Sequence, residues 1–389
     1  MHSPMRLSFL LLPLLLFPCR LGAQDLNTVR ELKQLWKFDE ATACLTQIMA
    51  EQGPQPVFLE ELADCHYQSG NYAEALNQYT LLSGLQPNKL LYKLRMMSLL
   101  NRGKNYKAVI DLGRDVLQRD SILQVVVMVG DAFNQLERRD SAEWYYRKAL
   151  ERRAHNESVL NKLSNILLGQ ERFGEVRVLA EDFLAEEPDN LTILPIAGLS
   201  YYFLEEYNKA YDTFEKANRL GDDSYAVHYY LGKCAQKFGI RDAEEREFTL
   251  AWERDSTDVG VALTIARVKA DLNRPDWETW YGKALDMLLP SPKLLETTGS
   301  AYQNYAHSAY MKGRFDSCIE LYKKVLEYSP KYYAAYYMIA QCYEYKYDYQ
   351  NALNWFKKAQ KVFAEGTRGR EIADAGAERV QAELFMIGD

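Results

Sequence analysis

Residues 56–83 read PVFLEELADCHYQSGNYAEALNQYTLLS, and the pattern of this stretch decides the fold. Apolar residues recur at helical spacing on both sides of Gly70-Asn71, a dipeptide that favours a turn. The spacing predicts one amphipathic helix over residues 56–69 and a second over residues 72–83. Pro87 follows, where a proline can begin the next helix but cannot continue the last one. The stretch is therefore a pair of helices joined by a tight turn.

The same pair recurs along the chain with a period of 34 residues. An aromatic residue begins the second helix at Phe38, Tyr72, Tyr106, Phe173, Tyr207, Phe315 and Tyr349. Small residues recur at Ala63, Gly130, Gly198, Gly232, Ala266, Ala306 and Ala340, and further aromatics at Tyr79, Tyr146, Phe214, Phe248, Tyr281, Tyr322 and Phe356. Two helices approach closely only where side chains are short, so a larger residue at a small position would cost about 1–3 kcal/mol. Such repetition predicts a solenoid, in which each repeat buries its apolar face on its neighbours.

One unit resembles the tetratricopeptide repeat especially well. The family pattern is a Trp or Leu, then a Leu-Gly, a Tyr, an Ala, a Phe or Tyr, an Ala and a Pro. That order is matched almost completely by Leu194, Ala197-Gly198, Tyr201, Tyr207, Ala210, Phe214 and Ala217. The resemblance covers ten units: 22–55, 56–89, 90–122, 123–155, 157–190, 191–224, 225–258, 259–296, 299–332 and 333–366. It implies an all-α, right-handed superhelical solenoid of about ten antiparallel helix pairs, closed by a C-terminal capping helix.

Two units depart from the pattern. In residues 90–122, Met97 and Gly113 stand where a small and an aromatic residue belong. Residues 259–296 lack a clear turn glycine, and the spacing grows there by about seven residues, which predicts an irregular joint. We therefore expect an N-terminal block of about eight repeats over residues 24–281 and the joint over residues 282–298. C-terminal repeats should follow over residues 299–366, and a capping helix with a tail over residues 367–389.

The first segment, residues 1–23, predicts a secretory signal peptide, with Arg6, an apolar run and the small residue Ala23. About a dozen apolar residues cannot cross a membrane core of about 30 Å, so we expect no membrane span after cleavage. Alternatively, Cys19 is the modified cysteine of a lipoprotein. Lipoprotein processing prefers a small residue directly before that cysteine, however, and Pro18 at this position is a poor match. We expect an exported protein in the periplasm or outer-membrane periphery of a Gram-negative bacterium.

The composition argues against most catalytic and nucleic-acid functions. The 389 residues carry 47 basic and 54 acidic side chains in interspersed order, whereas nucleic-acid binding needs clustered Lys and Arg. Phosphate-binding loops and nucleophile elbows are absent from the sequence, and its histidines do not fall at metal-ligand spacing. Adjacent carboxylates such as Glu244-Glu245 are interpreted as solvated helix surface. We therefore predict a protein that is not an enzyme and that needs no metal or cofactor.

Four cysteines form two candidate disulfide pairs, Cys44 with Cys65 and Cys318 with Cys342. Each pair would join the second helix of one repeat to the first helix of the next, and export would permit such bonds. The sequence does not show whether the Cα atoms lie within about 7 Å. Cysteine also replaces alanine at small positions between helices, so buried thiols are the alternative, and we favour it.

The resemblance also implies a binding surface, because first helices line a concave groove in tetratricopeptide repeat proteins. Carried onto this chain, the groove positions include Tyr67, Asn134, Asn165, Tyr202, Phe203, Tyr229, Lys233, His307, Tyr310, Tyr337 and Tyr345. The cradle of paired Asn and Lys or Arg that grips carboxyl termini in some members is not reproduced as a set. The implied function is a protein–protein interaction scaffold or adaptor of the cell envelope.

Tyrosine is concentrated near the end of the chain, where 13 of the 28 tyrosines lie between Tyr302 and Tyr349. Tyr suits interfaces because it buries a large area with few torsions and keeps its hydroxyl in water. Core packing accounts for about half of these rings. The others leave open an alternative partner, a glycan or cell-wall polymer that stacks on the tyrosines of the C-terminal groove.

Overall fold

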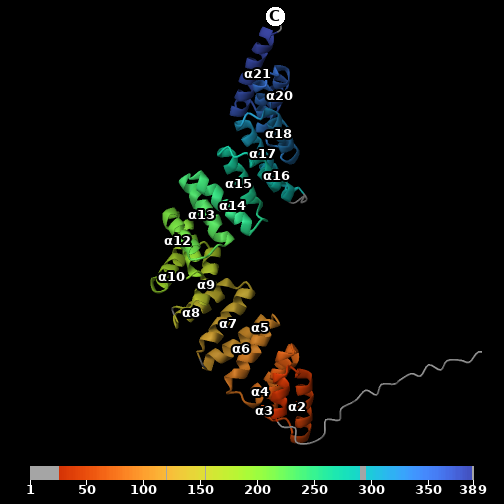
Figure 1. Ribbon diagram of the computed structural model, residues 1–389, viewed down its shortest axis with the longest axis vertical. Helices are drawn as coiled ribbons and strands as arrows, with labels where there is room; N and C mark the ends of the chain where they lie inside the picture. The colour runs from red at the N-terminus through yellow and green to blue at the C-terminus, as the bar shows by residue number, and fades with distance from the viewer. Residues whose placement is uncertain (1–25, 120, 154, 290–294, 388–389) are drawn as a thin grey trace, which may run out of the picture. The chain divides into compact units, whose positions relative to one another are not determined.

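The computed structural model describes residues 26–119, 121–153, 155–289 and 295–387 (Figure 1). The predicted signal peptide, Cys19 within it, and residues 290–294 of the predicted joint lie outside these described residues. Within them all 21 regular elements are α-helices, as predicted, and none is a strand. No helix of the described part combines the length and the apolar character that crossing a membrane requires.

The chain divides into two compact units, which meet between Val159 and Leu160. The helices of the first unit are α1 (Leu26–Gln34), α2 (Phe38–Gln52), α3 (Pro56–Gln68), α4 (Tyr72–Leu85), α5 (Leu90–Arg102), α6 (Tyr106–Arg119), α7 (Leu123–Gln135) and α8 (Arg139–Leu150). Helix α9 (Glu157–Gly169) crosses the boundary. The second unit continues with α10 (Phe173–Glu186), α11 (Ile193–Phe203), α12 (Tyr207–Arg219), α13 (Tyr225–Phe238), α14 (Arg241–Arg254), α15 (Val259–Asp271), α16 (Trp277–Leu288), α17 (Leu295–Met311), α18 (Phe315–Tyr328), α19 (Ala334–Tyr345), α20 (Tyr349–Val362) and α21 (Arg368–Ile387).

Helices α1 to α20 follow one another as ten pairs, which matches the predicted number of repeats. Helix α21 packs on α20 and α19 and so covers the apolar face of the last pair, as a capping helix does. Helix α17 has 17 residues and is the longest first helix described, so part of the insertion near residue 290 lengthens a helix. The division of the repeats into two blocks at residues 282–298 stays a prediction.

The small residues of one repeating series contact the aromatic residues of the other. Gly198 of α11 faces Phe214 of α12, and a Cβ added to Gly198 would lie 2.7 Å from the ring. Gly130 faces Tyr146 in the same way, with 2.8 Å to the ring. In each case the aromatic residue follows the small one by 16 positions. The predicted close approach of paired helices is confirmed, and the period is a rule of packing.

The departure at Met97 and Gly113 is explained by the same contact. These two residues are also 16 positions apart, but the large side chain now lies on the first helix and the small residue on the second. Met97 is fully buried, and its Cε lies 3.0 Å from where a Cβ of Gly113 would be. Exchanging the sizes conserves the volume of the contact, which is the kind of change that a core tolerates best.

Every pair turns through one residue in the left-handed backbone region, with φ between 57° and 84°. Glycine fills this position only at Gly70, Gly239 and Gly313. The other seven pairs place there Trp36, Lys104, Glu137, Glu171, Glu205, Asn273 and Tyr347. An L-residue in this region costs about 1–2 kcal/mol. The packing of the two helices therefore imposes the turn, and a glycine is not required to form it.

First helices of successive repeats also pack on one another within a unit. Helix α5 contacts α7 in the first unit, and α11 contacts α13 and α15 contacts α17 in the second. Among the described helices, successive second helices do not pack to the same extent. In these pairs the first helices lie side by side, and we call the layer that the first helices form in each unit its inner layer.

Candidate binding surface

None of the eleven predicted groove residues is fully buried. The exposed members are Asn134, Asn165, Phe203, His307 and Tyr345, and the half-buried members are Tyr67, Tyr202, Tyr229, Lys233, Tyr310 and Tyr337. Tyr67 and Asn134 belong to the first unit and the other nine to the second. The structure therefore brings together only the members within one unit, and the second unit holds most of the predicted surface.

Two of the exposed aromatic residues stack on the preceding repeat. The ring of Phe203 lies parallel to that of Phe173, with centroids 4.7 Å apart, and Tyr345 lies on Phe315 at 5.2 Å. In both pairs the two residues are 30 positions apart: one ends a first helix, and the other begins the second helix of the preceding repeat. The same spacing joins two cation–π pairs, Arg102 over Tyr72 at 4.2 Å and Lys237 over Tyr207 at 5.0 Å.

Sequence reasoning missed this contact, because it read these positions only as groove positions. The recurring 30-residue spacing of an aromatic residue and an aromatic or cationic partner is the signal that could have found it. Ring pairs of this kind add about 0.5–1.5 kcal/mol beyond the area that they bury. Phe203 and Tyr345 thus stabilise the stack of repeats, and only their outer faces are available to a partner.

The tyrosines of α11 and α13 are also engaged in packing. Tyr202 meets Tyr230 edge to face at 5.2 Å, and Tyr229 stacks on Tyr225 at 5.5 Å. Burial raises the pKa of Tyr202 to about 12, so its hydroxyl stays protonated. Substituting Tyr202 would therefore disturb the contacts between repeats as well as any binding.

The C-terminal tyrosines form ring contacts in the same way. The ring centroid of Tyr310 lies 6.0 Å from that of Tyr345 and 6.2 Å from that of Phe315, so these three residues form one aromatic cluster. Tyr337 lies 6.0 Å from Phe363. A stacking platform for sugars needs a ring with an open face, and the contacts at these tyrosines occupy part of each ring.

His307 lines a hollow of about 430 Å³ on the inner layer of the second unit. The hollow lies against α15, α16 and α17 and is lined by Arg267, Ala270, Asp271, Tyr281, Asn304, His307, Ser308, Met311 and Lys312. The Tyr281 hydroxyl lies 3.0 Å from Ser308 Oγ, which ties α16 to α17 beneath the hollow. Met311 is 67% exposed at its edge, so the hollow offers both polar and apolar contacts.

A buried carboxylate organises the surface beside this hollow. Glu244 of α14 is fully buried and accepts hydrogen bonds from Arg241 at 2.6 Å and Arg267 at 2.7 Å. The Gln236 side chain donates a third, at 2.8 Å. The interpretation of Glu244 as solvated helix surface is therefore wrong. Spacing along one helix could not reveal this burial, since Gln236 comes from the preceding helix α13 and Arg267 from α15 of the next repeat.

Family comparisons fit this geometry. Two tetratricopeptide repeat models match the chain, one at residues 26–83 and 306–366 and the other at residues 123–156. These segments are tetratricopeptide repeats. No curated protein matches the sequence.

Solved structures that are similar to the chain include the following three. YrrB, described as a TPR protein with an unusual peptide-binding site, is 18% identical with a TM-score of 0.34, and the match covers 60% of this chain and 97% of YrrB. A tetratricopeptide repeat protein from Parabacteroides merdae is 17% identical with a TM-score of 0.40, covering 67% and 98% of the two chains. Naa15/Naa10 bound to HypK-THB is 13% identical with a TM-score of 0.41, covering 91% and 61%.

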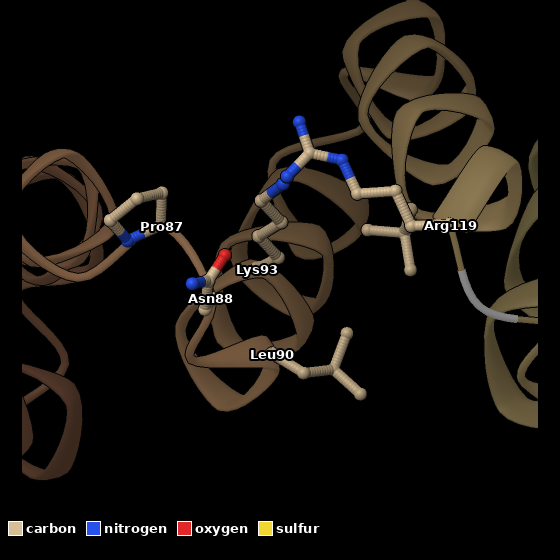
Figure 2. A pocket seen from close by; sticks show the side chains of 6 residues that line it. Pro87, Asn88, Leu90, Lys93 and Arg119 are labelled. Carbon is tan, nitrogen blue, oxygen red and sulfur yellow. The ribbon is translucent and has the colours of Figure 1, made fainter.

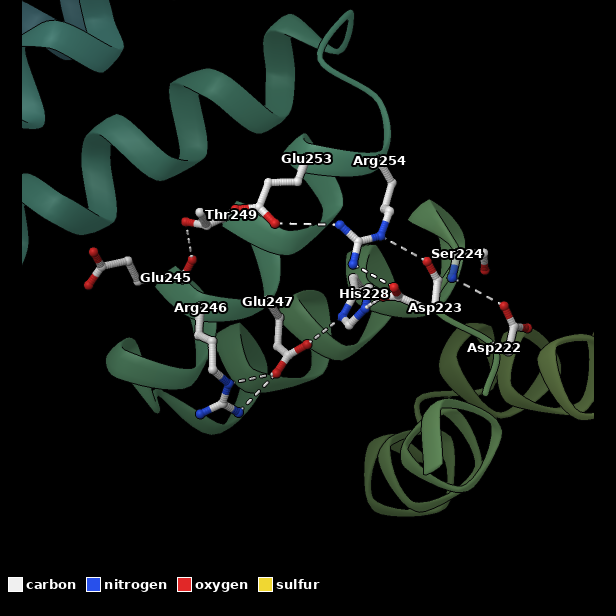
Figure 3. Close-up of polar contacts among 10 residues, drawn as sticks. All are labelled: Asp222, Asp223, Ser224, His228, Glu245, Arg246, Glu247, Thr249, Glu253 and Arg254. Carbon is white, nitrogen blue, oxygen red and sulfur yellow. Dashed lines mark hydrogen bonds and ion pairs between the residues drawn. The ribbon is translucent and has the colours of Figure 1, made fainter. Parts of the chain in front are cut away.

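A second polar cluster lies at the seventh repeat, around the buried side chains of His228 on α13 and Glu247 on α14 (Figure 3). His228 Nδ1 lies 2.8 Å from Glu247 and His228 Nε2 lies 2.7 Å from Asp223. Arg254 holds Asp223 at 2.5 Å and Arg246 holds Glu247 at 2.9 Å. Both ring nitrogens are occupied by carboxylates, so the imidazole has no nitrogen left to activate a nucleophile. The cluster is a charged brace between the loop before α13, α13 itself and α14.

In the first unit, a hollow of about 250 Å³ is lined by Pro87, Asn88, Leu90, Lys93, Val116 and Arg119. The lining side chains are drawn in Figure 2. Its two cations share one carboxylate, since Asp115 lies 2.7 Å from Lys93 and 4.0 Å from Arg119. This pairing leaves little net charge for an anion. Among the described residues, no group of three or more His, Cys, Asp or Glu side chains is placed to hold a metal ion.

The five cysteines of the described repeats are buried. Cys342 Sγ lies 3.0 Å from Cys318 Sγ, where α18 packs on α19. Burial raises the pKa of Cys65 to about 11 and that of Cys234 to about 12, so these thiols stay protonated and unreactive. The disulfides considered from the sequence, Cys44 with Cys65 and Cys318 with Cys342, stay a prediction.

Proposed function

We propose that the chain is a non-catalytic scaffold that holds a segment of a protein partner on the first-helix surface of its tetratricopeptide repeats. Repeats of this family generally mediate contacts between proteins. The observation that carries the proposal is the hollow of about 430 Å³ on α15 and α17, with His307 and Met311 exposed in it. A cavity of this size receives one or two side chains of a bound segment, and the flanking first helices extend the contact.

The proposed place of action is outside the cytoplasm, in the periplasm or at the outer-membrane periphery. This part of the proposal rests on the apolar run and the small residue Ala23 in residues 1–23. N-terminal sequencing of protein recovered from an envelope fraction tests it. A mature chain that begins near Gln24 would support export, whereas a full-length chain in the cytoplasmic fraction would refute it.

The binding test compares variants of exposed residues, because Tyr202 and Tyr337 also pack against other rings. Partners captured from envelope extract by the purified full chain are identified by mass spectrometry and then tested as purified proteins. The double variant His307→Ala, Met311→Ala should lose direct binding of the identified partner. The matched control is Val178→Ala on the second helix α10, where Val178 is 58% exposed. Equal binding by wild type, the double variant and the control would refute the assignment of the surface.

A further inference from the structure

The second unit gathers four cations on its inner layer and at the start of the adjacent second helix α14, in a chain whose formal net charge is -7. Lys233, Arg241, Arg267 and Lys312 lie on or beside α13, α14, α15 and α17. Hydrogen bonds connect three of these cations: Lys233 donates to Gln236, and Gln236 donates to Glu244, which also accepts hydrogen bonds from Arg241 and Arg267. Arg267 and Lys312 then line the same hollow. Within the described residues, these contacts place two carboxylates among the four cations, those of Glu244 and Asp271.

The buried carboxylate of Glu244 determines where the two guanidinium groups lie. It binds one terminal nitrogen of Arg241 and one of Arg267, while 40% and 33% of these side chains stay exposed. Removing a carboxylate from water is costly, and an ion pair at full burial often adds nothing to stability over apolar packing. What the arrangement does secure is orientation, because one carboxylate fixes an end of each guanidinium group and Arg267 is held where it lines the hollow.

We propose that this surface, from Lys233 to Lys312, binds an acidic segment of the partner protein, and the inference rests on the proposed function. Guanidinium groups match carboxylates in geometry and form charge-assisted hydrogen bonds with them. His307 and Asn304 add polar contacts in the hollow, and Met311 adds an apolar one. A polypeptide with spaced Asp or Glu side chains fits this mixture. Nucleic acid fits it less well, because four cations with two carboxylates among them do not form a track for a phosphate backbone.

The test uses the full-length chain and a fluorescent glutamate–alanine peptide, with the isosteric glutamine–alanine peptide as the control ligand. Only the acidic peptide should bind, and its affinity should fall as salt is raised, because salt screens these charges. Lys233→Gln and Lys312→Gln should each weaken binding about two- to fivefold, as is usual for exposed ion pairs. Lys324→Gln on the second helix α18 removes a cation that pairs with Glu327, at 2.8 Å, and should leave binding unchanged.

Neither lysine variant removes a direct partner of the buried Glu244, so both leave the packing of the repeats intact. Equal affinity for the two peptides, absence of binding by the acidic peptide, or affinity that ignores both lysine variants would each overturn the acidic-segment inference. An oligonucleotide that binds with the same dependence on Lys233 and Lys312 would also overturn it. If the inference fails while His307→Ala, Met311→Ala still loses the identified partner, the proposed scaffold function stands with a partner of different chemistry.

Discussion

Adding a single methyl group at Gly198 tests whether the period of the chain is a rule of packing. A Cβ at this position would lie 2.7, 2.8 and 2.9 Å from three ring atoms of Phe214. Carbon atoms in favourable contact lie about 3.5–4.0 Å apart, so either the ring or the helix must move. Phe214 is fully buried and stacks on Tyr230 with centroids 5.4 Å apart and planes 9° apart, which leaves the ring little room to retreat.

The magnitude follows from two opposing contributions. Overpacking a core costs about 1–3 kcal/mol, whereas alanine is favoured over glycine inside a helix by about 1 kcal/mol. We therefore expect Gly198→Ala to lower the free energy of unfolding by about 0–2 kcal/mol. For a unit of this size, each kcal/mol corresponds to a fall in Tm of about 2–4 °C. The assay is urea and thermal unfolding followed by circular dichroism.

Gly282→Ala in α16 is the matched control, because nothing lies within 4 Å of a Cβ at Gly282. It should stabilise the chain by about 0.5–1 kcal/mol through the helix preference alone. In a double-mutant cycle, Gly198→Ala should cost much less when Phe214→Leu has removed the ring. The reasoning is refuted if Gly198→Ala is as stable as Gly282→Ala, since the small position would then reflect no close approach.

Three further outcomes follow from the buried polar contacts. His228→Leu removes one partner of Glu247, whose side chain is 8% exposed, and leaves Arg246 as the other; it should lower the free energy of unfolding by about 2–3 kcal/mol, and a loss below about 0.5 kcal/mol would contradict the brace. Tyr146→Phe removes a hydrogen bond to Asp131 of 2.8 Å and should cost about 1 kcal/mol in the same unfolding assay. Burial raises the pKa of Glu245, but hydrogen bonds from Arg274 and Lys269 outweigh it and leave the pKa below its usual value. At Glu245 the folded chain therefore binds fewer protons than the unfolded chain. The stabilisation from these ion pairs is present above the ordinary glutamate pKa, and it is lost as pH falls through the lowered pKa of the folded state. Glu245→Gln should lower Tm at pH 7, with the difference shrinking toward pH 3, and a constant difference would contradict the ion pairs.

The prediction of repeats succeeded because its signals are local. Helical spacing and turn residues such as Gly70-Asn71 act over a few positions, and the 16-residue partnership of Gly198 with Phe214 lies within one repeat. The prediction of groove residues was less complete. Phe203 and Tyr345 lie at the surface, but a partner 30 residues away occupies one face of each ring. No pattern within a single repeat contains that contact.

The amino-acid sequence alone determined the class of the fold, the number of repeats and the pairing of helices, because apolar periodicity and side-chain size act between neighbours along the chain. The tertiary structure decided the chemistry of the inner surface. It buried Glu244 among Arg241, Arg267 and Gln236, although Glu244 stands in a sequence pattern typical of exposed carboxylates. It also imposed left-handed turns on residues as unsuited as Trp36 and Tyr347. Both outcomes follow from the packing of whole helices, whose combined contacts outweigh the preference of any one residue.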